Sequence, residues 1–169
     1  MRRLLALAVV SAAAVAVAPA VPARASGPSR AAGKRYAART YVHQLGRHRK
    51  FALEGGRHVV RARDGSKITA WNIVLADSGD GTGEAVLLFR NRRFLGWASA
   101  FDTVHLGVHT RGRAIRVAYG VYSGNDPFCC PHAVRTISYR WNGSRIVAGG
   151  TPPRSYGRRG DRLHLARRG

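Results

Sequence analysis

Residues 68–97 read ITAWNIVLADSGDGTGEAVLLFRNRRFLGW, and this stretch decides the fold class. Apolar side chains recur at every second position in three runs, Ile68–Ala76, Glu84–Phe89 and Phe94–Ser99. A period of two is typical of β-strands. Gly- and Asp-rich residues 77–83 and the Asn91-Arg92-Arg93 tripeptide separate the runs with turn-forming residues. The stretch therefore predicts consecutive antiparallel strands.

The same alternation continues on both sides of this stretch. Further strands are predicted over His58–Ala62, Val104–Val108, Ala114–Tyr122 and Val134–Trp141. Asn142-Gly143 is a strong hairpin signal, and Arg145–Val147 would be the return strand. Short strands joined by hairpin turns predict a mainly β (β-rich α+β) fold: an antiparallel sheet, a sandwich or a partly open barrel.

The N-terminus has the three parts of a secretory signal. Arg2 and Arg3 precede the apolar run Leu4–Val17, and Ala23-Arg24-Ala25 forms an A-x-A cleavage site before Ser26. Residues 1–25 are therefore predicted to be a signal peptide, and the mature chain is expected to be secreted without an integral membrane span. No cysteine lies near the cut, so a diacylglyceryl anchor is not expected there.

Composition divides the mature chain into three predicted parts. Residues 26–56 are a flexible lead-in with a short helix within Ala31–Gln44 and a loop over Arg47–Arg57. Residues 57–148 form the β-rich domain. Residues 149–169 combine Gly, Pro and Arg with few apolar anchors, which predicts a disordered basic tail.

The charge of the chain is strongly positive. Twenty-nine Lys and Arg stand against eight Asp and Glu, for a net charge of +21 in 169 residues. Such a field attracts polyanions. Because the chain is exported, we expect anionic cell-envelope polymers or lipid head groups rather than nucleic acid, unless the arginines only reflect composition and solubility. The candidate polyanion-binding residues are Arg90, Arg92, Arg93, Arg158, Arg159, Arg167 and Arg168.

The two cysteines of the chain are neighbours, Cys129 and Cys130, between Pro127 and Pro131. An oxidising compartment favours pairing, and the one intramolecular pairing is a strained vicinal disulfide. Two alternatives remain open at this point. The thiols could be buried small hydrophobes, or they could serve a redox or soft-metal role with His132.

Two motifs resemble the LppP/LprE family of exported actinobacterial lipoproteins. The first is Asp126-Pro127-Phe128-Cys129-Cys130-Pro131, and the second ends the following strand with Trp141-Asn142-Gly143. The hairpin Ala85–Gly96 is also similar to one in that family. The resemblance implies export, envelope residence and a small β-rich domain, with no enzymatic activity to carry over. Two departures stand out: the lipobox cysteine is missing, and Arg93 lies at or beside an expected turn glycine.

No catalytic constellation is present among the common hydrolase, zincin and β-lactamase motifs. Residues 77–84 hold three carboxylates, but their spacing fits a hairpin loop rather than an EF-hand, so no metal or other cofactor is predicted. We expect a non-enzymatic envelope or extracellular protein that docks on anionic surface polymers. The alternatives are a thiol/redox or metal-binding protein using the Cys-Cys pair, and a secreted cationic nucleic-acid-binding or antimicrobial protein.

Overall fold

The computed structural model describes residues 26–44, 46–77, 82–104, 106–123, 125–127, 130–153 and 162–167. The predicted signal peptide, residues 1–25, lies outside these ranges. One helix, α1 (Arg30–Arg39), comes first. The strands are β1 (Thr40–Gln44), β2 (Arg47–Arg61), β3 (Lys67–Leu75), β4 (Thr82–Arg90), β5 (Arg93–Trp97), β6 (Thr103–Val104), β7 (Leu106–Arg111), β8 (Ala114–Val121), β9 (Ala133–Trp141), β10 (Ile146–Ala148) and β11 (His164–Leu165).

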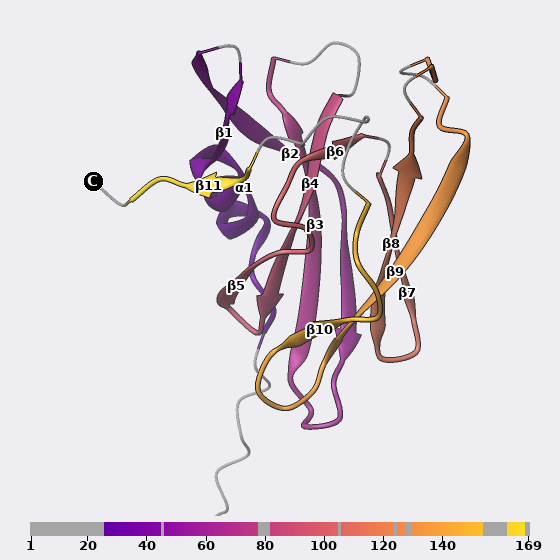
Figure 1. The fold of residues 1–169 in the computed structure, drawn as a ribbon. Helices are drawn as coiled ribbons and strands as arrows, with labels where there is room; N and C mark the ends of the chain where they lie inside the picture. Colours follow the sequence, from indigo (N-terminus) through magenta and orange to yellow (C-terminus); the bar gives the residue numbers. More distant parts are fainter. Residues whose placement is uncertain are drawn as a thin grey trace, which may run out of the picture.

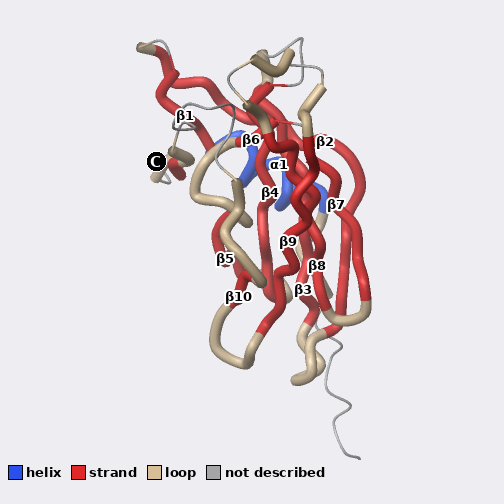
Figure 2. Tube along the Cα trace, turned by 45° about the vertical axis from the view of Figure 1, so that its right-hand side comes forward, coloured by secondary structure: helices blue, strands red, loops and turns tan. Residues whose placement is uncertain are grey.

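The strands form two antiparallel sheets. The first has the order β11-β1-β2-β3-β4-β5, with β6 beside β4, and the second has the order β10-β9-β8-β7. The first sheet curls, and β2 packs against β7 and β8 of the second sheet. The edge strands β5 of the first sheet and β10 of the second sheet lie near each other (Figures 1 and 2). The predicted mainly β fold with a short N-terminal helix is confirmed.

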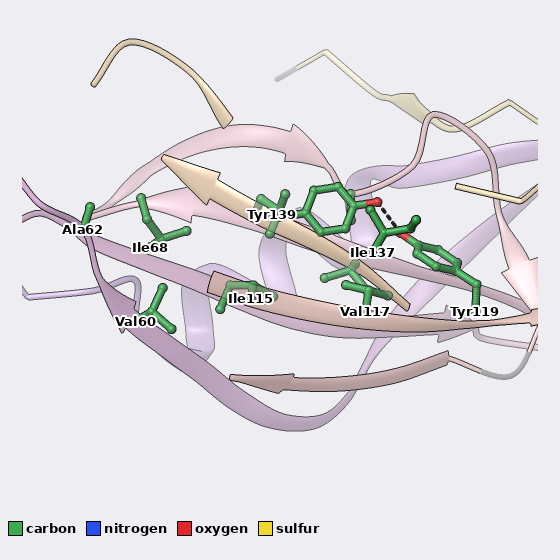
Figure 3. Close-up of a cluster of buried hydrophobic side chains, with 12 residues drawn as sticks. Val60, Ala62, Ile68, Ile115, Val117, Tyr119, Ile137 and Tyr139 are labelled. Carbon is green, nitrogen blue, oxygen red and sulfur yellow. Dashed lines mark hydrogen bonds between the residues drawn. The ribbon is translucent and has the colours of Figure 1, made fainter. Parts of the chain in front are cut away.

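The main core fills the space between the two sheets. Ile68, Val86 and Leu88 of the first sheet meet Ile115 and Val117 of the second, all at most 2 % exposed. Figure 3 shows Tyr119 and Tyr139 in the same cluster, with their hydroxyl groups joined by a 2.6 Å hydrogen bond. This bond lets two buried hydroxyl groups satisfy each other, which removes most of the cost of burying them.

A second core covers the opposite face of the first sheet. Trp71, Ile73, Leu87 and Phe89 point to this face, and Ala37 of α1 packs against them. Figures 1 and 2 show α1 on the side of the first sheet that is away from β8 and β9. Strands β3 and β4 are therefore buried on both faces, which explains why apolar residues occupy both halves of their alternating pattern.

The predicted loop over Arg47–Arg57 is wrong, because this segment is most of the long strand β2. The sheet thus begins at Thr40, before the predicted domain boundary at residue 57. Many β2 side chains are exposed and polar, so the segment lacks a clear apolar alternation. Backbone pairing with β3 forms the strand, and a register shift between Glu54 and Arg57, with Gly55 at φ 72, interrupts that pairing.

The predicted disordered tail over residues 149–169 is wrong for residues 162–167. Strand β11 pairs with β1 through Thr40↔Leu165 and Tyr41↔His164, and Leu163 is only 4 % exposed in the second core. The Arg39 side chain also donates hydrogen bonds to the carbonyl of Ala166. Burial of Leu163 and these backbone bonds hold a segment whose composition alone predicts disorder. Residues 154–161 lie outside the described residues.

Two predicted hairpin turns are confirmed. Asn91 and Arg92 form the turn between β4 and β5, and Asn91 adopts a left-handed backbone with φ 52. Asparagine tolerates this conformation, so the turn forms without a glycine, and Arg93 begins the next strand. In the hairpin after β9, the Asn142 side-chain oxygen accepts hydrogen bonds from the backbone of Ser144 and Arg145.

Within the described ranges, no helix is long and apolar enough to cross a bilayer.

Candidate functional site

An open groove lies at the end of the molecule where three chain reversals meet. Its volume is about 1270 Å³. The turn after β2, the turn between β7 and β8, and the end of β9 line it, and all three lie at the lower end of Figure 1. Five arginines line this groove, which we call the arginine groove: Arg63, Arg111, Arg113, Arg116 and Arg140.

A tight turn projects two of these arginines from one hairpin. Arg111 ends β7 and pairs with Ala114 at the start of β8, so Gly112 and Arg113 are the two turn residues. Gly112 has φ 57, and a positive φ at the first turn position favours glycine in such hairpins. The turn therefore places two guanidinium groups within three residues, both at the groove.

Strand alternation places Arg116 and Arg140 on the outer face of the second sheet. Their neighbours Ile115, Val117 and Tyr139 point into the core, so the arginines point away from it. The Nε atom of Arg116 is buried and has no hydrogen-bond partner among the described residues. A buried donor without a partner is costly, and a bound anion would satisfy it.

Asp64 is the one acidic side chain among the described groove residues, and its charge is already paired. Its Oδ1 accepts hydrogen bonds from the backbone and hydroxyl of Ser66 at 3.0 and 2.6 Å. Its Oδ2 accepts from Arg90 Nη2 at 3.1 Å and from Trp141 Nε1 at 3.0 Å. The bonds from Ser66, and then those from Trp141 and Arg90, hold the pKa of Asp64 below its ordinary value.

Arg90 also fixes the ring of Trp141. Its guanidinium carbon lies 4.6 Å from the centroid of the indole ring, which is a cation–π contact. Trp141 is therefore held by a charged group over its ring and by a carboxylate at its ring nitrogen. It forms a rigid wall of the arginine groove. Each lining arginine carries a positive charge, so the groove is strongly cationic.

The other family motif lies at the opposite end of β9. Asp126 accepts hydrogen bonds from the backbone and hydroxyl of Ser123, at 2.6 and 2.8 Å, and its Oδ2 lies 2.7 Å from His132 Nδ1. The backbone bond from Ser123, followed by the bond to His132, strongly lowers the pKa of Asp126. Asp126 therefore caps the turn before β9. The Cys130 amide donates a hydrogen bond to the Pro127 carbonyl at 3.0 Å.

The predicted vicinal disulfide involves Cys129, which lies outside the described residues. No free cysteine occurs in the described part of the chain, which includes Cys130. The bridge between these neighbours stays a prediction. Pro131 is half-buried, and its Cβ is one of the atoms nearest to Gly120 of β8. The motif thus begins β9 next to the core, far from the arginine groove.

The predicted polyanion-binding residues do not lie together in the structure. Arg90 is engaged with Asp64 and Trp141, and Arg92 donates to the hydroxyl of Ser26 at 2.9 Å. Arg93 lines a different groove, beside β10. Arg167 is exposed after β11, and Arg158, Arg159 and Arg168 lie outside the described residues. The motif residues Trp141 and Gly143 do line the arginine groove.

The predicted polyanion-binding residues include none of the five groove arginines, Arg63, Arg111, Arg113, Arg116 and Arg140. One signal was available, because the Arg111-Gly112-Arg113 tripeptide places two arginines on a predicted turn. The contribution of Arg63 had no such signal, since it comes from a turn distant in sequence.

The predicted absence of a metal site concerns residues 77–84, of which residues 78–81 lie outside the described part. Glu84 is buried on β4, and its Oε2 accepts a hydrogen bond from the Asn72 amide at 3.4 Å. No group of three His, Cys, Asp or Glu side chains suited to a metal ion occurs among the described residues.

Comparison with known proteins gives one family. Residues 66–144 match the model of the LppP/LprE lipoprotein family, from the residue before β3 to the hairpin after β9. No curated protein and no solved structure gives a significant match. The match covers both predicted motifs and confirms the resemblance that they indicated. Residues 66–144 are therefore similar to the LppP/LprE lipoprotein family, and this similarity indicates association with the cell envelope.

Proposed function

We propose that this protein is a non-enzymatic envelope protein that binds anionic cell-surface polymers in the arginine groove. One observation carries the proposal: five arginines line one groove, and its single described carboxylate, on Asp64, is paired with Arg90. A planar guanidinium group matches phosphate and carboxylate oxygens in two-point hydrogen bonds. An anion in the groove would therefore find several unopposed donors.

The shape of the groove supports a polymer rather than one small anion. It is open, and its arginines come from three separated segments, the turns at Arg63 and Arg111–Arg113 and the sheet face at Arg116 and Arg140. A chain with repeated charges could contact several of them at once. Such binding releases counterions, so its affinity falls steeply with salt.

The test measures binding of inorganic polyphosphate and of purified teichoic acid over a range of salt concentrations. The groove variant is Arg111→Gln/Arg113→Gln/Arg140→Gln. Its control is Arg35→Gln/Arg47→Gln/Arg57→Gln, which removes the same charge from exposed positions on α1 and β2. Each lost phosphate contact should reduce the slope of log affinity against log salt by about one, or about three for the groove variant.

Two outcomes would contradict the proposal. An equal loss in both triple variants would mean that net charge, and not the groove, binds the polymer. Tighter binding of duplex DNA than of teichoic acid, lost in the same groove variant, would favour a nucleic-acid-binding protein instead.

The proposal also includes secretion and a vicinal disulfide between Cys129 and Cys130. The A-x-A site before Ser26 and the missing lipobox cysteine support release of the chain from the membrane. Intact mass of the protein secreted by its host should begin at Ser26. The chain should accept no alkyl group before reduction and two after it. A lipid-modified chain, or free thiols, would contradict this part.

A further inference from the structure

A second groove opens where the two sheets fail to close on each other. It lies between the edge strands β5 and β10, which are side by side in Figures 1 and 2. Its volume is about 370 Å³. Strand β2 packs against β7 and β8 on the other side, whereas the two sheets are open to each other along this seam between β5 and β10. We call it the seam groove.

The floor of the seam groove is part of the main core. Leu88 and Tyr139 are each 2 % exposed, and Ala98 is 8 % exposed. Leu95 and Ile146 pack against the same cluster from the two edges. The Tyr139 hydroxyl is bonded to Tyr119, so it is already satisfied. A ligand in the groove therefore meets a mainly apolar floor.

Two cations stand at the rim of this floor. Arg93 begins β5, Arg145 precedes β10, and both are exposed. The described residues that line the seam groove include no carboxylate. An apolar floor beneath two unopposed guanidinium groups is complementary to a molecule with an apolar body and one anionic end.

From this complementarity we infer that the seam groove binds an anionic amphiphile with a single acyl chain, such as a fatty carboxylate. The chain lies along Leu88, Ala98 and Ile146, and the carboxylate pairs with Arg93 and Arg145. Ligand pockets commonly measure roughly 300–1,000 Å³, and the seam groove is at the lower end of that range, which suits one chain rather than two.

This inference is independent of the proposed polymer binding, because the two grooves share only Trp141 among their lining residues and β10 lies between them. Its residues alternate, so Ile146 and Ala148 line the seam groove whereas Val147 lines the arginine groove. A bulky residue can therefore be placed in either groove from adjacent positions on the same exposed strand.

The test titrates the full chain with dodecanoate below its micelle concentration and follows heat and tryptophan fluorescence. We expect saturable binding of one molecule per chain and weaker binding of octanoate. Dodecyltrimethylammonium, with the same chain and the opposite charge, should not bind. Arg93→Gln/Arg145→Gln should weaken dodecanoate binding by about tenfold or more, because two charge-assisted contacts are lost.

A matched pair of blocking variants locates the site. Ala148→Phe should abolish dodecanoate binding and leave polyphosphate binding unchanged. Val147→Phe should leave dodecanoate binding unchanged, whether or not it weakens polyphosphate binding. Circular dichroism would show that both variants fold. The inference is overturned if the cationic amphiphile binds equally well, if the double arginine variant binds normally, or if polyphosphate displaces dodecanoate. Failure of polymer binding alone leaves the inference intact.

Discussion

The indole nitrogen of Trp141, at the end of the second sheet, donates a 3.0 Å hydrogen bond to the carboxylate of Asp64, in the turn after β2. The bond joins the two sheets at the arginine groove. Arg90 of the first sheet completes the contact from β4, since it pairs with Asp64 and lies over the Trp141 ring. The tryptophan of the family motif thus fixes the relative position of the sheets where the groove forms.

Replacing Trp141 by Phe removes this donor and keeps an aromatic ring beneath Arg90. We expect the pKa of Asp64 to rise toward its ordinary value, because the Trp141 bond lowers it. Ser66→Ala is the matched comparison and should raise the pKa further, since the hydroxyl bond that it removes is the largest cause of the shift, while the backbone bond from residue 66 remains. Carboxyl NMR titration measures both. A larger rise in Trp141→Phe than in Ser66→Ala would contradict this ranking.

Alkaline pH should destabilise the protein through Tyr119 and Tyr139. Burial raises the pKa of Tyr139 from 10 to about 12 and raises that of Tyr119 further. These tyrosines ionise at a lower pH in the unfolded chain than in the folded protein. The contribution of the two neutral tyrosines to the free energy of unfolding is therefore complete below pH 10 and is lost as the pH rises through the folded pKa values. Each tyrosine should remove about 1–2 kcal/mol between about pH 10 and 11.5.

Denaturant unfolding at a series of pH values measures this loss, and the ultraviolet absorbance of tyrosinate reports ionisation of the tyrosines at the same time. The double variant Tyr119→Phe/Tyr139→Phe lacks both groups and should show a much flatter dependence above pH 10. If the double variant keeps the wild-type slope, other groups cause the alkaline loss.

Acid should weaken the turn before β9 through Asp126. Its hydrogen bonds with Ser123 and His132 place its pKa well below the ordinary 3.8. The contribution of ionised Asp126 to the free energy of unfolding is therefore complete above the pKa that Asp126 has in the unfolded chain. It is lost as the pH falls through the lower pKa of the folded protein. Asp126→Asn should lower the melting temperature at pH 7 and flatten the dependence of stability on pH below 4. An unchanged acid profile in Asp126→Asn would contradict the capping role.

Gly83 should tolerate no side chain. It has φ 79, and an added Cβ would lie 2.6 Å from Cγ of the buried Leu75. Gly83→Ala should cost about 2–4 kcal/mol in the free energy of unfolding, from backbone strain and overpacking together. Gly46 has a similar φ of 72 with open space around it, so Gly46→Ala should cost only about 1 kcal/mol. Equal losses would mean that the contact with Leu75 adds nothing.

The alternation of apolar residues in the sequence predicted those strands whose alternating side chains are buried in the structure. Strands β3, β4, β8 and β9 alternate in sequence and are paired in the structure, and Asn91 and Asn142 form the turns that their residue types favour. Strand β11 and the first part of β2, Arg47–Arg57, were not predicted, whereas the predicted strand His58–Ala62 covers the end of β2. Most of β2 is exposed and polar, and β11 has only two residues, so pairing with neighbours creates both.

The sequence by itself determined the mainly β fold, the main hairpins, the strongly positive charge and the two family motifs, because each depends on residues close together in the chain. Only the tertiary structure decided where the charge gathers. Arg63, Arg116 and Arg140 meet because a turn of the first sheet packs against the second sheet, and the seam groove exists because β5 and β10 are edges that do not pair. Such sites depend on contacts between distant segments, which local patterns do not encode.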